Sequence, residues 1–255
     1  MAEAPGTLEG WYALHDFRRV DWTALSSSTA TTRQEIAAET ELYLRTAESL
    51  TRSGDGASAA YRIVGHKADF LFLHLRPTLE QLSALEDQLN GLALNEFCSR
   101  PYSYMSVVEL SLYEATARGE TEDEAALLEQ PFVRRRLYPE IPSDKPYLSF
   151  YPMNKRRGES VNWYTADMEE RRRMMRDHGA IGRQYTDKIQ QMITGSIGLD
   201  DWEWGVTLFA SDPLAFKKLV TAMRFDEVSA KYAEFGPFYT GYRITPEFLG
   251  EMIHR

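Results

Sequence analysis

The order of predicted elements repeats along the chain, and this repeat constrains the fold more than any other feature. In the first half, residues 7–15, 61–64, 68–75 and 102–113 have strand patterns, with helical patterns between them. In the second half, residues 147–153, 202–209 and 238–244 predict strands, and a capping pattern at Asp167 opens a helix that we expect to reach about Thr194. Each half thus follows the order strand, helix, strand, strand, helix, strand, with the second hairpin as the weakest part of the pattern.

Two such units in succession are typical of tandem ferredoxin-like domains. Helices cover one face of each sheet, and the other face must be covered too, most simply by the sister sheet. The sequence therefore predicts an α+β fold of two βαββαβ domains that form a dimeric α+β barrel with a cavity at its mouth. We expect the domains at residues 1–115 and 145–255, with a linker at 116–144 between them; its charged first part, up to Gln130, fits either a linker or an exposed helix.

Composition narrows the class of partner. The formal net charge of -9 argues against nucleic acid and anionic membrane surfaces, although three short basic clusters at 134–136, 155–157 and 171–173 could meet a small anion. A single cysteine, Cys98, excludes an intrachain disulfide, which fits a reducing compartment. The first ten residues lack a signal-peptide pattern and no apolar run is long enough to cross a bilayer, so we expect a cytoplasmic protein.

His178 is the histidine that stands out among five. It shares the apolar face of the predicted helix with Met174 and Ile181, and the small residues Gly179 and Gly182 leave space for a flat group. No HxxxH, HxxE or CxxC spacing surrounds it, so a metal at His178 would need its other ligands from a cofactor such as haem. From the residues alone, a buried histidine with one hydrogen bond is the simpler explanation.

The strand at residues 147–155 is the second candidate. With a period of two, Tyr151, Met153 and Lys155 project to the same side. A phenol, a thioether and an ammonium group on one face suit a pocket for an aromatic anion. An edge strand with an extended lysine explains the pattern equally well.

Four segments together resemble a known family. They are Tyr-Pro-Met-Asn-Lys-Arg-Arg at 151–157, the segment 174–182, Trp-Gly-Val-Thr-Leu-Phe at 204–209 and Met-Arg-Phe-Asp-Glu-Val-Ser at 223–229. In this order they look like coproheme decarboxylases of the Gram-positive type, a branch of the chlorite-dismutase-like superfamily. The resemblance covers nearly the whole chain.

The resemblance implies a reaction. Such enzymes bind iron coproporphyrin III (coproheme), which is substrate and redox cofactor at once. Hydrogen peroxide drives the oxidative decarboxylation of two propionates to vinyl groups, which gives haem b through a three-propionate intermediate. The resemblance also implies a homopentamer, and transient contact with a ferrochelatase stays open.

The resemblance also assigns roles to residues. His178 corresponds to the iron ligand, Tyr151 to the tyrosine whose radical attacks the propionate, and Lys155 to the lysine tied to the second decarboxylation. The remaining matches are to groups around the porphyrin: Arg136 (or the adjacent Arg135), Arg224 and Ser229 at propionates, Met153 in the pocket, and Gln191 on the distal side with Gln190 next to it.

Three rival functions use fewer of these residues. Chlorite dismutation on the same fold needs a distal arginine, and the matching position here is Gln191. A haem-binding protein without turnover needs His178 and the arginines but not Tyr151. A purely structural ferredoxin-like oligomer needs none of them.

Overall fold

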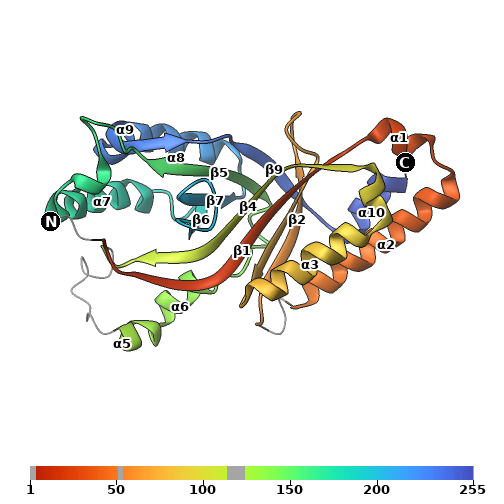
Figure 1. The fold of residues 1–255 in the computed structure, drawn as a ribbon, viewed down its shortest axis with the longest axis horizontal. Coiled ribbons are helices and arrows are strands. Elements are labelled where there is room, and N and C mark those ends of the chain that lie inside the picture. The colour runs from red at the N-terminus through yellow and green to blue at the C-terminus, as the bar shows by residue number, and fades with distance from the viewer. Residues whose placement is uncertain (1–3, 51–53, 114–123, 255) are drawn as a thin grey trace. The chain divides into compact units, whose positions relative to one another are not determined.

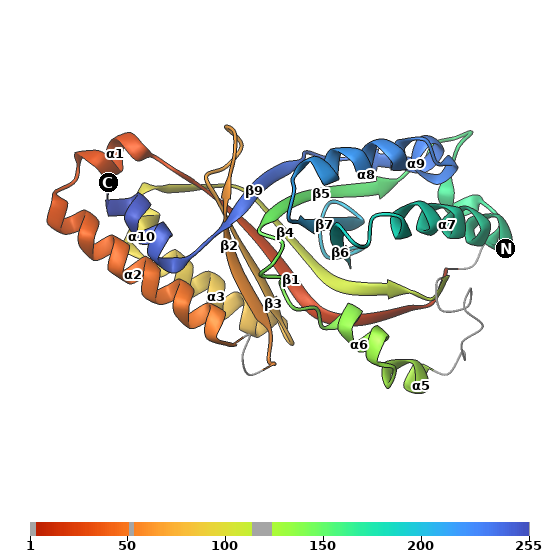
Figure 2. The ribbon, with the colours of Figure 1, turned by 180° about the vertical axis from the view of Figure 1, so that it is seen from behind.

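The computed structural model describes residues 4–50, 54–113 and 124–254, which form an α+β fold built on antiparallel sheet. The chain divides into two compact units (Figures 1 and 2). Unit 1 contains Met1–Gly10 and Ser106–Phe238, and unit 2 contains Trp11–Met105 and Tyr239–Arg255. Two long strands, β1 (Thr7–Val20) and β4 (Cys98–Ser111), run from one unit into the other. Within the described residues, no helix is both long and apolar enough to cross a membrane.

The sheet of unit 2 has the strand order β4-β1-β3-β2-β9. Strands β2 (Ala57–Ile63) and β3 (Phe70–Arg76) form the hairpin predicted around Gly65, and β9 spans Tyr239–Ile244. Gly65 has φ +105°, a value that L side chains rarely adopt, so glycine suits this turn. The pairing of Leu14 with His74 and of Phe17 with Leu71 sets the antiparallel register of β1 on β3.

Helices cover one face of the unit 2 sheet (Figure 1). They are α1 (Trp22–Ser27), α2 (Ala30–Ser49), α3 (Leu79–Gly91) and α10 (Pro246–His254), with a 3-10 turn at Ala93–Phe97. Thr29 and Thr78 cap α2 and α3 by accepting a backbone N–H, as expected at helix starts. Buried side chains of α2, including Ile36 and Leu44, pack with Phe70 and Phe72 of the sheet into one core.

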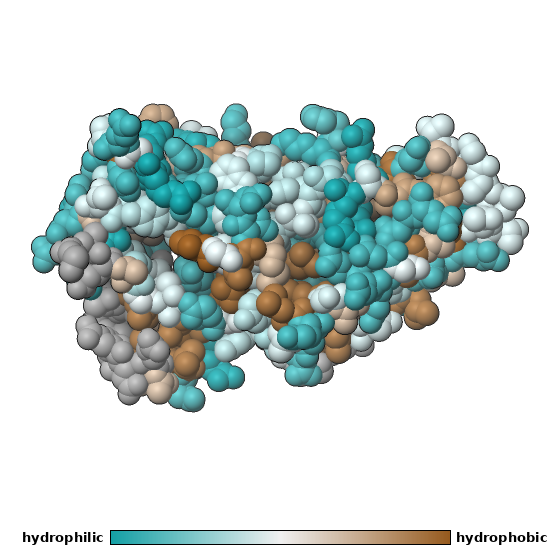
Figure 3. Space-filling model, viewed as in Figure 1, coloured by the Kyte–Doolittle hydropathy of each residue, from teal (hydrophilic) through white to brown (hydrophobic). Residues whose placement is uncertain are grey.

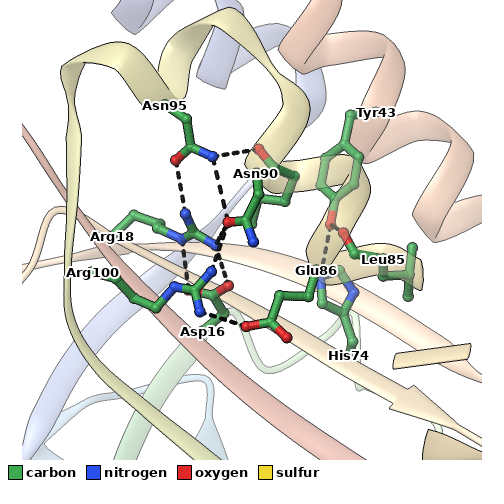
Figure 4. A network of polar contacts seen from close by, with 10 residues as sticks. Asp16, Arg18, Tyr43, His74, Leu85, Glu86, Asn90, Asn95 and Arg100 are labelled. Atoms are coloured by element: carbon green, nitrogen blue, oxygen red, sulfur yellow. Dashed lines mark hydrogen bonds and ion pairs between the residues drawn. The ribbon is translucent and has the colours of Figure 1, made fainter. Parts of the chain in front are cut away.

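A buried polar network ties unit 2 together (Figure 4). The Arg18 guanidinium donates two hydrogen bonds to the Asp16 carboxylate, at 2.7 and 2.6 Å. It also donates to the side-chain oxygens of Asn90 and Asn95, both at 2.8 Å. Because all these groups are satisfied, the ion pair can remain in a region where an unpaired charge would be costly.

Unit 1 has the strand order β4-β6-β7-β5-β8. Its strands are β5 (Tyr147–Lys155), β6 (Ile189–Gly195), β7 (Trp204–Ala210) and β8 (Ala233–Phe235). Its helices are α5 (Glu124–Leu128), α6 (Pro131–Leu137), α7 (Met168–Arg183), α8 (Leu214–Arg224) and α9 (Glu227–Tyr232), with a 3-10 turn at Trp163–Thr165. The core between β5, β7 and α8 includes Tyr151, Val206 and Phe216.

The predicted helix from Asp167 to about Thr194 is wrong in its second part. Helix α7 ends at Arg183, hydrogen-bonded turns follow, and residues 189–195 form β6. Strand β6 pairs antiparallel with β7, so these two strands are the hairpin that the pattern left weak. The spacing of Ile189 and Met192 fits a helical stripe, but in the strand Ile189 and Ile193 share one face and Met192 lies on the other.

The predicted domains at 1–115 and 145–255 describe a sequence repeat, whereas the compact units interleave segments from both ends of the chain. Each half does follow the element order of that repeat. Helices α5 and α6 lie in the segment predicted as a linker, and their buried Leu127, Val133 and Leu137 pack with Leu8 and Leu110. Part of that segment, residues 114–123, lies outside the described residues. The domain bounds themselves stay a prediction.

Candidate functional site

Strand β5 presents the predicted site residues on one face. Tyr151, Met153 and Lys155 occupy every second position of β5 and therefore share a face. Met153 pairs with Trp204 on β7 and with Phe235 on β8. On the surface view, apolar side chains gather where Figure 1 draws β6 and β7, below α7 (Figure 3). The β5 face therefore combines three functional groups with an apolar surround.

Gln191 lies on the same face of the sheet. It pairs with Leu208, which pairs with Ser149, two residues before Tyr151. Directly paired residues, and residues two apart on one strand, share a face. The side chain of Gln191 is exposed.

Helix α7 comes close to Gln191 at a glycine. A Cβ built on Gly182 would lie 3.6 Å from Gln191 Nε2 and 3.2 Å from Met223 Cε. Gly182 is one helical turn beyond His178, so the glycine keeps this side of α7 flat next to the predicted ligand.

Tyr151 is enclosed by aromatic rings. Only 8% of the residue is exposed, and its ring centroid lies 4.4 Å from that of Phe238 and 5.7 Å from that of Phe235. Burial raises the pKa of Tyr151 to about 12, against the opposing effect of Arg224. The phenol therefore keeps its proton at neutral pH. Arg224 packs its guanidinium carbon 3.7 Å from the centroid of the Phe235 ring.

His178 is oriented by a carboxylate. Its Nδ1 lies 2.8 Å from Asp226 Oδ2. Because an ionised carboxylate only accepts hydrogen bonds, this contact places the ring proton on Nδ1 and leaves the lone pair of Nε2 for another partner. The His178 side chain is 30% exposed and that of Asp226 is 4% exposed, so the outward part of the imidazole is the accessible one.

Asp226 is itself held by the start of α9. Its Oδ1 accepts the backbone N–H of Ser229 at 2.9 Å, and its Oδ2 accepts the Ser229 hydroxyl at 3.0 Å. Burial raises the pKa of Asp226, but the hydrogen bonds from His178 and Ser229 outweigh burial and hold the pKa below its usual value. The carboxylate therefore stays ionised as the acceptor for His178.

Lys155 lies close enough to Asp226 to feel its negative charge. The residue is 9% exposed, and its Nζ lies 4.8 Å from the centroid of the Trp163 ring. Burial lowers the pKa of Lys155 to about 8, although the negative charges of Asp226 and Glu203 act to raise it. Lys155 can therefore change its charge close to neutral pH.

The other predicted site residues lie on three different elements, α6, α9 and β6. Arg136 and Arg135 are both exposed on α6, so their placement does not choose between them. Ser229 is buried and its hydroxyl serves Asp226, while its predicted contact with a propionate stays a prediction. Gln190 donates from Nε2 to the backbone oxygen of Glu140 at 3.2 Å.

Asp226 is a candidate functional residue that the sequence alone does not indicate. Asp226 stood inside one of the four segments, and its spacing of three from Ser229 is the signal of a helix cap. The contact that matters joins residues 48 apart in the sequence. No local pattern contains that pairing.

A single imidazole that is hydrogen-bonded to a carboxylate can bind a metal ion whose other ligands come from a cofactor. Such a partner on the second ring nitrogen fixes the orientation of a metal-binding histidine and increases its basicity. Among the described residues, no three His, Cys, Asp or Glu side chains gather as a protein-only metal site would require. The donor set of His178 thus fits the axial position of a metal whose other ligands belong to a cofactor.

Comparison with known proteins shows which family this chain belongs to. The family model described as chlorite dismutase matches residues 33–244. Two proteins that carry the name "Putative heme-binding protein" are similar to this chain. The one from Haloquadratum walsbyi is 47% identical over 253 residues, which is 99% of this chain and 48% of that protein. The one from Natronomonas pharaonis is 46% identical over 255 residues, 98% of this chain and 42% of that protein. The chain thus spans about half the length of these relatives.

Solved structures extend the comparison. A protein described as a novel heme-binding protein from Thermus thermophilus matches with TM-score 0.92 and 43% identity, over 100% of this chain and 99% of that one. A mutant chlorite dismutase from Candidatus Nitrospira defluvii matches with TM-score 0.76 and 19% identity, over 97% and 96% of the two chains, and so shares the fold. On the family model and on these similarities, the chain belongs to the chlorite dismutase family.

Proposed function

We propose that this protein binds coproheme through His178 and converts it to haem b by peroxide-dependent oxidative decarboxylation. The observation that carries the proposal is the hydrogen bond between His178 Nδ1 and Asp226, which would orient the ring so that Nε2 could hold the iron. The names of the haem-binding relatives support the cofactor class. The resemblance of the four segments supports the reaction.

The porphyrin would supply the redox chemistry, because bound iron lets peroxide act as a two-electron oxidant. Each propionate, –CH2CH2COO⁻, reacts with one H2O2 and one H⁺ to give –CH=CH2, CO2 and two H2O. One C–H bond and the C–C bond to the carboxylate break, one C=C bond forms, and peroxide is reduced to water. The protein must therefore bring a hydrogen-atom relay and a carboxylate-binding group to the porphyrin edge.

Tyr151 and Lys155 suit these two tasks. The Tyr151 phenol is protonated and lies among aromatic rings, so it can give up a hydrogen atom and then take one from the propionate. Lys155 follows Tyr151 and Met153 on the same face of β5 and carries an ammonium group when protonated. Arg224, close to Tyr151, would add a charge-assisted contact to a propionate.

The decisive experiment uses Tyr151→Phe, which keeps the ring and removes only the hydroxyl. We expect the variant to bind coproheme as the parent does and to form almost no haem b when peroxide is added, as followed by mass spectrometry. Tyr147→Phe, at the start of the same strand, is the matched control and should turn over. Haem b formation by Tyr151→Phe at the parental rate would remove Tyr151 from the reaction.

The same experiment separates the two alternative functions. A haem-binding protein without turnover would bind coproheme and leave all four propionates in the parent protein. A chlorite dismutase would release O2 from chlorite, and the exposed Gln191 in place of a distal arginine argues against that reaction. Product analysis with coproheme and, separately, with chlorite distinguishes the three.

Finer features of the resemblance belong to the same proposal. They are the Gram-positive decarboxylase type, the tandem ferredoxin-like domains within an α+β barrel, the homopentamer, contact with a ferrochelatase and a cytoplasmic location. Size-exclusion chromatography with light scattering tests the pentamer directly. The curated relatives are about twice as long as this chain. The proposed activity is therefore that of the whole protein, and assigning it to this chain is part of the proposal.

A further inference from the structure

Glu203 is a buried carboxylate that the proposed function does not use. It is 7% exposed and directly precedes β7, at the end of the turn from β6. Its backbone N–H donates to Asn154 Oδ1 at 2.8 Å, and its carbonyl accepts the Ser196 N–H at 2.8 Å. The first contact holds Glu203 against the end of β5, and the second holds it against the end of β6.

The side chain of Glu203 turns back onto the same strand. Its Oε2 accepts the backbone N–H of Lys155 at 2.8 Å, and its Oε1 lies 3.7 Å from Arg157 Nη1. Burial and the Glu203 carboxylate together raise the pKa of Tyr164, so that this phenol keeps its proton beside Glu203. The carboxylate thus holds the backbone of Lys155 and places a negative charge near its ammonium group.

Two negatively charged side chains, Asp226 and Glu203, act on the buried Lys155 side chain. The lysine faces the Trp163 ring from the 3-10 turn, Asp226 from the start of α9, and Glu203. Asp226 is already engaged by His178 and Ser229. Burial favours the neutral amine of Lys155, and the negative charges of Asp226 and Glu203 both act to raise its pKa.

We infer that Glu203 is a positioning residue: its buried carboxylate holds the Lys155 backbone at the end of β5, so that the lysine side chain can pair with a carboxylate of the substrate. This inference rests on the proposed function in taking Lys155 as the carboxylate-binding group. Glu203 is not among the residues to which the family resemblance assigns a role. The inference therefore adds a residue at the β6–β7 turn that would control the charge state of Lys155.

The first test needs no substrate. In the ligand-free protein with 13C-labelled lysine, the NMR shift of Lys155 is followed against pH and is assigned by its loss in Lys155→Met. Glu203→Gln keeps an oxygen acceptor for the Lys155 N–H and removes the charge, so the midpoint should fall by about one pH unit. Glu203→Asp, which restores the charge, should return the midpoint toward that of the parent.

Glu234→Gln is the matched control, because Glu234 is an exposed carboxylate next to the same end of β5, where it meets Arg156. It should leave the Lys155 midpoint unchanged. An equal midpoint in Glu203→Gln and the parent would overturn the inference. If Glu203→Gln does not fold, Glu203→Asp carries the test, because its shorter side chain draws the carboxylate away from Lys155 and the midpoint should fall part of the way; a midpoint equal to that of the parent would then overturn the inference.

The second test uses coproheme and peroxide. The pH above which the three-propionate intermediate accumulates should fall in Glu203→Gln by the same amount as the Lys155 midpoint. A lysine midpoint that moves without any change in this product profile would contradict the link to substrate. If the parent itself gives no haem b, the proposed function fails, while the NMR titration still decides whether Glu203 controls Lys155.

Discussion

One hydrogen bond decides what His178 can do. With Nδ1 donating to Asp226, the ring directs Nε2 away from the carboxylate, and the direction of the ring is fixed by a buried group. The Ser229 N–H and hydroxyl keep that carboxylate in place at the start of α9. The ligand, its partner and the helix cap therefore act as one unit.

Asp226→Ala should weaken this unit without removing the ligand. Loss of such a partner typically costs about 10–100-fold in metal affinity, and we expect a loss of that size for coproheme, with a shifted Soret band. Porphyrin titration followed by absorbance measures both. Asp177→Ala is the control, because Asp177 neighbours His178 on α7 but is exposed and meets Arg173. Equal affinities of Asp226→Ala and the parent would exclude Asp226 from ligand support.

Individual site residues differ in how far the sequence could predict them. Tyr151, Met153 and Lys155 share a face because strand periodicity is local, and the structure agrees with that placement. His178 could be singled out by its apolar helix face. Its bond to Asp226 could not, because it depends on how α7 packs against the start of α9.

At the scale of elements, the buried pair Asp16–Arg18 holds β1 to the end of α3 and to the turn that follows it. The side chains of Arg18 and Asp16 are 5% and 1% exposed. Arg100, at 34% exposure, sits at the edge of the same network and pairs with Glu86 at 2.5 Å (Figure 4). The two arginines therefore offer a matched comparison of buried and exposed ion pairs.

Arg18→Met should destabilise the protein far more than Arg100→Met. Removing Arg18 leaves the Asp16 carboxylate buried without its bidentate partner, which costs about 3–5 kcal/mol. Arg100→Met removes a partly exposed pair and should cost about 1 kcal/mol or less. Urea unfolding at pH 7 measures both. Similar losses for the two variants would mean that the network does not hold β1 in the way its geometry indicates.

The elements themselves were predicted unevenly. The first-half hairpin carries a glycine turn signal, and β2 and β3 pair as expected. The second hairpin was hidden, because Ile189 and Met192 continue the apolar spacing of α7 and no glycine or proline stands between Arg183 and Ile189. Residues 189–195 form a strand because they pair with β7. The partner residues lie outside the segment, so its own sequence pattern does not reveal the pairing.

At the scale of the whole molecule, two buried histidines in unit 2 contribute to how the stability of the protein depends on pH. His15 is 0% exposed and lies edge-on to Tyr104, while His74 is 1% exposed. His74 makes hydrogen bonds at both ring nitrogens, with Ser58 at 2.8 Å and Tyr43 at 3.0 Å. Burial lowers the pKa of His15 and of His74 to about 3, and for His74 the Arg76 cation adds to the effect.

Folding should therefore become less favourable as the pH falls below about 6.5, the ordinary pKa of an unfolded histidine. Between about pH 6.5 and 3 the unfolded chain binds protons that the folded chain does not, so stability rises with pH and is complete above this window. Well inside the window, each histidine contributes about 1.4 kcal/mol per pH unit. Partly buried Glu48 and Glu109, whose pKa burial raises, act in the opposite direction, so parent and variant must be compared.

His74→Gln is the variant that isolates one of these protons. It should be less stable than the parent at pH 7, because the hydrogen bonds to Ser58 and Tyr43 are disturbed. Between pH 6 and 5, however, its free energy of unfolding should fall less steeply, by about 1.4 kcal/mol per pH unit at the lower end. His66→Gln changes an exposed turn residue and should keep the parental slope. Urea titrations at several pH values give these slopes, and a parental slope in His74→Gln would show that His74 does not stay neutral in the folded protein.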